Sequence, residues 1–262
     1  SDFFVAPAFG YETKTLQIVE DGQRVARYRV SDTQAALSAG VELLDWGEIR
    51  LGYRYGDSRS RVLIGDPLLP ERESDIGGAY LQFGYDRLDS TYFPKHGQAF
   101  RVRWLADRES LGASVDADIV EASWQFARSY QRSSFVFTLD GGSALDDRVN
   151  SGLELFTLGD FLKLSGLPRD SLIGTQYGLV RTIYYRRISR GGSGIFEFPA
   201  YAGFSLEAGN VWDVRDEVEL NELLTAGSVF LGAESPVGPL HLAVGHAEGG
   251  FTSFYLLVGH TF

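Results

Sequence analysis

Two serines lie in glycine-rich segments that partly match the nucleophile elbow of a serine hydrolase. Such an elbow reads Gly-x-Ser-x-Gly and presents the serine hydroxyl on a tight turn, where a neighbouring base can activate it. Ser143 lies in Gly-Gly-Ser-Ala-Leu and Ser193 lies in Gly-Gly-Ser-Gly-Ile, so both segments lack the final glycine. We interpret both as loops, and we predict that this chain has no catalytic residue and is not an enzyme.

The histidines are scattered along the chain. His96, His241, His246 and His260 each lack a second histidine or a carboxylate at the spacing that metal sites use. The chain has no cysteine, which excludes thiolate metal sites and disulfides. The acidic segment 71–75 could offer oxygen ligands to Ca²⁺, but it has no EF-hand spacing and we interpret it as a solvated loop. We therefore predict no metal and no cofactor.

Charge and composition limit the class of protein. A formal net charge of −11 argues against a nucleic-acid-binding protein, because such proteins present basic surfaces to phosphates. No run of about 18 apolar residues is present, so the sequence predicts no transmembrane helix. Tyrosine (13) and phenylalanine (18) together are as frequent as glycine (31). The chain has no methionine and begins at Ser1, so we expect a processed chain or a piece of a longer one.

Apolar and polar residues alternate along most of the chain, which is the pattern of β-strands. In residues 48–55, Leu51 and Tyr53 share one face of the strand, and Arg50 and Arg54 share the other. The same alternation recurs in residues 81–86, 100–104, 135–140, 202–207 and 240–245. Each of these segments therefore has one apolar face and one polar face.

Two structures would explain strands of this kind. In a soluble sandwich the apolar faces form the core, whereas in a transmembrane barrel they contact lipid and the polar faces line the lumen. The apolar faces are rich in aromatic residues, and the polar faces carry glycines and charges of both signs. Short and long connections also alternate. These features favour an antiparallel transmembrane β-barrel.

Twelve strands are predicted, and an even number places both ends of the chain on the same side of the sheet. Their ranges are 2–19, 23–44, 48–65, 77–86, 98–107, 116–130, 134–145, 177–190, 199–212, 226–236, 238–247 and 252–262. Long connections are expected at 66–76, 108–115, 146–176 and 213–225. In strand 177–190, Arg181, Arg186 and Arg187 occupy both faces, which indicates a bulge or an uncertain register.

The last predicted strand has the pattern of a barrel-closing strand. One face carries Phe254, Leu256, Val258, His260 and Phe262, and the other carries Tyr255, Leu257, Gly259 and Thr261. Chain ends of soluble proteins usually fray. A final strand that ends on an aromatic residue is typical of outer-membrane barrels, whose interfaces carry aromatic girdles.

Four segments in residues 77–262 resemble the BamA/TamA-like superfamily of outer-membrane barrels. Residues 86–97 match its D…FP…G pattern, and residues 156–167 match a long loop that folds back into the lumen. Residues 207–213 are similar to its GxVW strand end, and residues 235–240 are similar to its SPLGPL turn. Together the four segments are specific for this superfamily.

The fold-back segment indicates which branch of this superfamily the sequence resembles. Assembly and transport members usually have Val/Ile-Arg-Gly-Phe/Tyr there, and this arginine contacts the inner wall of the barrel. Residues 164–167 read Leu-Ser-Gly-Leu, so Ser165 replaces the arginine and Gly166 is retained. With Arg169 downstream, this segment resembles the patatin-like type Vd autotransporters, typified by PlpD. We expect Arg169 to replace the missing arginine.

The resemblance implies that Arg169 pairs with a lumenal carboxylate such as Glu207 or Asp140. It also implies a barrel of sixteen strands, so about four strands are expected to precede Ser1, together with a POTRA domain and a patatin lipase. Residues 1–262 would then be one barrel domain that anchors the lipase and translocates it.

The expected location is the outer membrane of a Gram-negative bacterium. The expected partners are membrane lipids, the barrel-assembly machinery and the attached lipase and POTRA domains, with a homo-oligomer allowed. A twelve-strand barrel, the barrel of an assembly insertase and a passive porin are the alternatives. An outer-membrane phospholipase is disfavoured, because no histidine shares a strand with Ser205 or Ser228.

Overall fold

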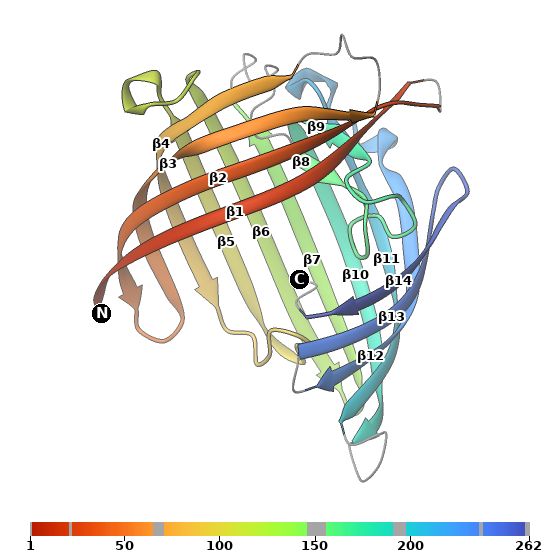
Figure 1. Cartoon of the computed structure of the whole chain (residues 1–262). Helices are drawn as coiled ribbons and strands as arrows, with labels where there is room; N and C mark the ends of the chain where they lie inside the picture. The colour runs from red at the N-terminus through yellow and green to blue at the C-terminus, as the bar shows by residue number, and fades with distance from the viewer. Residues whose placement is uncertain are drawn as a thin grey trace.

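The computed structural model describes residues 2–20, 23–64, 71–145, 156–190, 198–235 and 238–259. Within these ranges twelve strands form one antiparallel sheet, in which every neighbouring pair follows chain order. The sheet curls around a central space, and its two edges are β1 (Phe3–Glu20) and β14 (Phe251–Val258) (Figure 1). The predicted all-β barrel wall of twelve strands is confirmed, and in the described part of the chain the sheet is not closed.

The strand bounds follow the alternating sequence pattern. The wall strands are β1 (Phe3–Glu20), β2 (Gln23–Leu43), β3 (Gly47–Ile64), β4 (Arg72–Asp86), β5 (His96–Asp107), β6 (Ala117–Tyr130), β7 (Ser133–Ala144), β10 (Gln176–Arg190), β11 (Pro199–Trp212), β12 (Leu224–Ser235), β13 (Gly238–Ala247) and β14 (Phe251–Val258). All predicted strands except the fourth and the last agree with these bounds to within two residues at each end.

The fourth strand corrects the interpretation of the acidic segment as a loop. β4 begins at Arg72, so residues 72–75 belong to the wall. Glu73 lies opposite Arg59 of β3, and the Arg59 Nε atom is 2.8 Å from its carboxylate. A cross-strand ion pair of this kind lets charged residues extend a sheet beyond its apolar part. The predicted irregularity in β10 is a register shift between Arg187 and Ser189.

The outer face of the wall is apolar and exposed. Leu51 on β3 is 61% exposed, and Leu242 on β13 is 59% exposed. A continuous apolar face of this extent marks a surface that contacts something other than water. In a sandwich these side chains would form the core, so the structure selects the barrel interpretation.

The connections differ in length at the two ends of the wall. One end carries the longer ones, which include the 3₁₀-helices η1 (Glu109–Leu111), η3 (Arg215–Glu217) and η4 (Leu220–Glu222). The other end carries the turns at 44–46, 87–95 and 131–132. Longer loops of bacterial barrels are extracellular, and on this basis we orient the upper end of Figure 1 outward. Among the described residues, no helix is long and apolar enough to cross a membrane.

Candidate functional site

Residues 156–174 fold back into the space that the sheet encloses (Figure 1). β8 (Phe156–Leu158) and β9 (Leu172–Gly174) pair as a short antiparallel ribbon, and residues 159–171 form its tip. At this tip Leu162 is 1% exposed, and Leu164 and Ser165 are 0% exposed. The predicted inward-folded loop is confirmed, and we refer to residues 159–171 as the plug tip.

Glu207 of β11 binds the plug tip through its carboxylate, which is buried. One carboxylate oxygen accepts the backbone N–H groups of Leu164 (2.7 Å) and Ser165 (2.8 Å). The other accepts the hydroxyls of Ser165 (2.7 Å) and Ser205 (2.6 Å). Four donors offset the cost of removing this charge from water. Of the two wall carboxylates that we expected to meet the loop, Glu207 therefore does so, and it meets Ser165.

The plug tip has an unusual backbone. Four non-glycine residues of the tip have positive φ angles. Leu162 (φ 62°), Leu164 (φ 68°) and Asp170 (φ 51°) have left-handed helical values, and Asp160 has a φ of 146°. Large side chains rarely adopt positive φ, and each such residue costs on the order of 1–3 kcal/mol. The Leu162 N–H donates to the Ser165 hydroxyl at 2.8 Å, and this bond closes the tip on itself. Such a backbone persists because its surroundings fix it.

Gly166 is held between two strands of the wall. Its φ is +112°, and a Cβ atom there would lie 2.5 Å from the backbone nitrogen of Ala247 in β13. Its N–H donates to the Tyr255 hydroxyl (2.8 Å), and its carbonyl accepts the Ser253 hydroxyl (2.8 Å), both from β14. Only glycine fits this position, because of both its conformation and the available space.

Arg181 of β10 is the arginine that joins the wall to the plug tip. Its guanidinium donates to the Leu162 carbonyl at 2.7 Å and to the Asp140 carboxylate at 3.3 Å. Its side chain is 11% exposed and that of Asp140 is 18% exposed, so this pair is largely shielded from water. Sequence reasoning missed this role. The feature that could have indicated it was an arginine within a predicted barrel strand, because a charged side chain there is expected to face the lumen and not the lipid.

The expected pairing of Arg169 with a wall carboxylate is wrong. Arg169 lies after Gly166, in the part of the plug tip that returns to β9. Its side chain is 80% exposed. Its guanidinium lies 3.5 Å from Asp160 and 3.7 Å from Asp170, both in the plug tip itself. Arg169 therefore contributes a solvated loop charge, and the contacts with Glu207 and Asp140 are made by Ser165 and Arg181.

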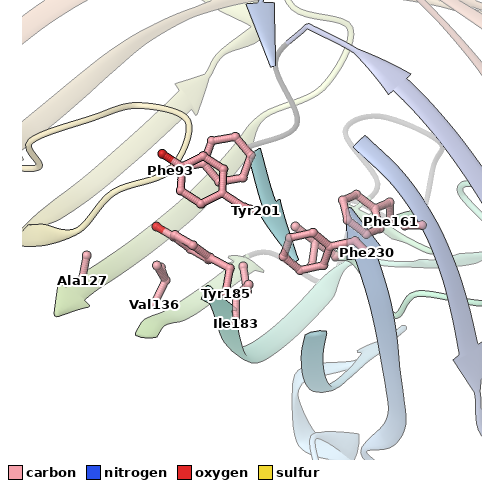
Figure 2. Close-up of a cluster of buried hydrophobic side chains, with 10 residues drawn as sticks. Phe93, Ala127, Val136, Phe161, Ile183, Tyr185, Tyr201 and Phe230 are labelled. Atoms are coloured by element: carbon pink, nitrogen blue, oxygen red, sulfur yellow. The ribbon is translucent and has the colours of Figure 1, made fainter. Parts of the chain in front are cut away.

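An aromatic cluster receives the plug tip from one side and the 87–95 turn from the other. Phe93 of this turn is 1% exposed and stacks on Tyr201, with the ring centroids 4.3 Å apart (Figure 2). The Tyr185 hydroxyl donates to the carbonyl of Pro94, which fixes the turn against β10. The D…FP…G segment thus folds into the space enclosed by the wall.

The plug tip reaches the same cluster through Phe161. Its ring lies 6.0 Å from the ring of Phe230 in an edge-on arrangement (Figure 2). The His241 ring lies 5.2 Å from that of Phe93 and 5.7 Å from that of Phe161. The two loops, which come from opposite ends of the wall, therefore share one packed cluster.

The remaining lumen is polar. A cavity of about 1040 Å³ lies mainly beside β1–β7, next to the plug. Gln82, Arg103 and Glu121 face it as register partners across three strands, and Arg103 and Glu121 lie 3.8 Å apart. The plug thus fills the lumen beside the C-terminal strands and leaves a charged cavity beside the others.

The closing strand has the predicted faces. Phe254, Leu256 and Val258 point outward and are 81%, 76% and 63% exposed. Tyr255 and Leu257 point inward and pack against the aromatic cluster. Gly259 follows β14 and donates its N–H to the Pro239 carbonyl at 2.9 Å. His260 and Phe262 lie outside the described residues.

The residues considered for hydrolytic or metal chemistry do not form a site in the described part of the chain. Ser143 lies in β7 and not in a loop, and its hydroxyl donates to the Ala144 carbonyl and accepts a bond from Arg215. The segment around Ser193 lies outside the described residues. Within the described ranges, no three His, Asp or Glu side chains gather as metal ligands would.

Comparisons with known proteins identify the fold. No protein-family model matches the sequence, and no curated protein matches it. A similar solved structure is the crystal structure of BamA from Haemophilus ducreyi lacking POTRA domains 1-3, with a TM-score of 0.72 and 12% sequence identity. The match covers 97% of this chain and 58% of that chain, so this chain spans little more than half of the BamA chain. The chain therefore has the fold of the BamA outer-membrane β-barrel.

Proposed function

We propose that this chain is the barrel domain of an outer-membrane protein of a Gram-negative bacterium. It anchors and translocates an attached N-terminal domain, as in the patatin-like type Vd autotransporters. The observation that carries this proposal is the plug tip, which is seated in a polar lumen and bonded to buried Glu207, inside a wall whose outer face is apolar. Membrane lipids and the barrel-assembly machinery are the implied partners.

The contacts of the plug tip support the autotransporter branch. Ser165 stands where assembly members are expected to have an arginine, and backbone N–H groups reach Glu207 in place of a guanidinium. These neutral donors attach the loop to Glu207 through three hydrogen bonds and leave the cavity beside β1–β7 open. A partly open lumen suits the passage of a polypeptide segment. The attached lipase and POTRA domains are part of this proposal.

A second candidate is the barrel of an assembly insertase. It is favoured by the fold shared with BamA and by the two sheet edges, since β1 and β14 each pair on one side only in the described structure. An exposed strand edge can pair with a strand of another chain. This function would act on other proteins, whereas the anchoring function acts on the attached domain.

One experiment separates the two candidates. The full-length protein is expressed in Gram-negative cells, and protease is added to intact cells to digest whatever lies outside. The anchoring and translocating function predicts that the N-terminal domain is digested, and that deleting the gene leaves other barrels at normal levels. Protection of that domain together with loss of other barrels on deletion would support the insertase instead.

A further inference from the structure

Two arginines lie directly opposite each other on the outer face of the wall. Arg29 of β2 and Arg61 of β3 are register partners, and both side chains are exposed. Tyr11 and Tyr55 share this face, because alternate residues of a strand point the same way. Directly opposed Cβ atoms lie about 4.5–5.5 Å apart, a spacing at which like charges destabilise the sheet.

One described carboxylate lies beside this pair of arginines without forming an ion pair with it. The Glu71 carboxylate accepts the Val62 N–H at 3.3 Å, next to Arg61. Neither Arg29 nor Arg61 forms an ion pair with a described residue. Arg59, two residues before Arg61 on the same face, differs, because its Nε atom lies 3.3 Å from Asp57 and 2.8 Å from Glu73. Two neighbouring guanidiniums without an ion-pair partner among the described residues can bind an anion.

The position of the pair indicates the source of the anion. Tyrosines of barrel girdles lie at the membrane interface, and we assign the outward-facing Tyr11 and Tyr55 to this girdle. Arg29 pairs with Thr15, which lies four residues beyond Tyr11 on β1. With about 3.4 Å per residue and a tilt of about 45°, this places Arg29 roughly 10 Å outward from the girdle. Phospholipid headgroups span about 5–8 Å on each side. A lipid with a taller, sugar-containing headgroup reaches this level.

We propose that Arg29 and Arg61 together bind the phosphate of a glycolipid in the outer leaflet. Arginine suits this role because its planar guanidinium donates two parallel hydrogen bonds to phosphate. Two arginines on adjacent strands converge on one phosphate, which removes their mutual repulsion. The site rests on the proposed outer-membrane location, and it gives the wall a specific contact with lipid in addition to its apolar belt.

The test uses the full-length protein in neutral detergent, with lipopolysaccharide as the probe and native mass spectrometry as the readout. The R29Q/R61Q variant is expected to bind the lipid about tenfold more weakly, because two charge-assisted bonds are lost. The control is R128Q/R186Q. It removes the same charge from exposed, outward-facing arginines near the other end of the wall, which are not register partners. Its binding is expected to equal that of the wild type.

Two further probes identify the ligand. Dephosphorylated lipopolysaccharide is expected to bind wild type and R29Q/R61Q equally, and millimolar inorganic phosphate is expected not to displace the lipid. Unchanged lipopolysaccharide binding by R29Q/R61Q, or equal weakening by the control, would overturn the proposal, as would displacement by free phosphate. Insertion into phosphatidylcholine vesicles is measured separately. Its failure would count against the barrel function and not against the lipid site.

Discussion

The Ser165 hydroxyl donates a hydrogen bond of 2.7 Å to the Glu207 carboxylate, and both residues are buried. This bond joins the tip of the fold-back loop to the inner surface of the wall. The charge at this contact belongs to the wall, and the loop supplies neutral donors. The charged donor Arg181 also belongs to the wall and binds a loop carbonyl. The polar contacts of the plug tip with Glu207 and Arg181 are therefore made by its backbone and one hydroxyl, beside the apolar packing of Phe161.

Replacing Glu207 by alanine is expected to release the plug tip. The N–H groups of Leu164 and Ser165 would lose their acceptor, and each buried donor without a partner costs about 1–3 kcal/mol. Conductance of the full-length protein in planar bilayers should rise toward that of a variant lacking residues 163–171. Glu121→Gln is the control, because Glu121 faces the cavity and has no bond to the tip. Equal conductance of Glu207→Ala and wild type would contradict this account.

The two arginines near the plug should behave differently. Arg181→Ala removes the bond to the Leu162 carbonyl and leaves Asp140 without its partner, so more frequent channel opening is expected. Arg169→Ala removes an exposed side chain, and exposed pairs contribute only about 0–1 kcal/mol. Its conductance should match that of the wild type. A larger effect for Arg169→Ala than for Arg181→Ala would restore the role expected from the family resemblance.

Charge on the outer face should impair folding into lipid. Leu81→Arg places a guanidinium among side chains that face outward, at a cost of about 2–4 kcal/mol near the bilayer midplane. The yield of folding into phosphatidylcholine vesicles should therefore fall. Gln125→Arg on β6 faces the polar cavity, opposite the uncharged Ala99 and Thr138, and should fold like the wild type. Reversal of the two yields would show that the assigned faces are wrong.

The 87–95 turn should lose stability in acid. Burial raises the pKa of Asp89, but backbone N–H bonds from His96 (3.1 Å) and Lys95 (2.7 Å) outweigh it, so the pKa lies below its usual value. A lowered folded-state pKa favours the ionised, folded turn. Its contribution is complete above the unfolded pKa of about 4, and it is lost as pH falls through the lowered value.

The role of Asp89 is measured by unfolding the protein in guanidinium chloride between about pH 2 and pH 6. The quantity compared is the denaturant concentration at which half of the protein is unfolded. Wild type should lose stability relative to Asp89→Asn as the pH falls, because asparagine does not titrate. A constant difference between the two proteins across this range would mean that Asp89 does not stabilise the turn.

The strand pattern allowed most of the fold to be predicted, because a period of two assigns each side chain to one face. Phe254 and Leu256 were thus placed outward correctly. The inward path of the loop was also predictable, since Leu162 and Leu164 are too apolar for water. The direction of Arg169 was not predictable, because it depends on the left-handed backbone of those same leucines, which leucine rarely adopts.

The role of Arg181 was hidden for a different reason. Arginines lie on both faces of β10, so the sequence pattern did not show which of them faces the lumen. The alternation from Gln176 to Arg186 is unbroken and places Arg181 inward, where it meets the Leu162 carbonyl, and the register shift lies beyond it, between Arg187 and Ser189. The extension of β4 to Arg72 depends on ion pairs with a neighbouring strand, which local sequence does not show. Contacts between distant segments therefore determined each feature that was missed.

The central claim, that this chain forms the wall of a membrane barrel around a polar lumen, is tested most directly by spin labels along β4. The chain has no cysteine, so Leu81→Cys, Gln82→Cys, Phe83→Cys and Gly84→Cys each give a single labelling site. We predict that labels at 81 and 83 collide with lipid-soluble oxygen, and that labels at 82 and 84 collide with a water-soluble nickel chelate. Equal accessibility at all four positions, or the opposite alternation, would contradict the barrel.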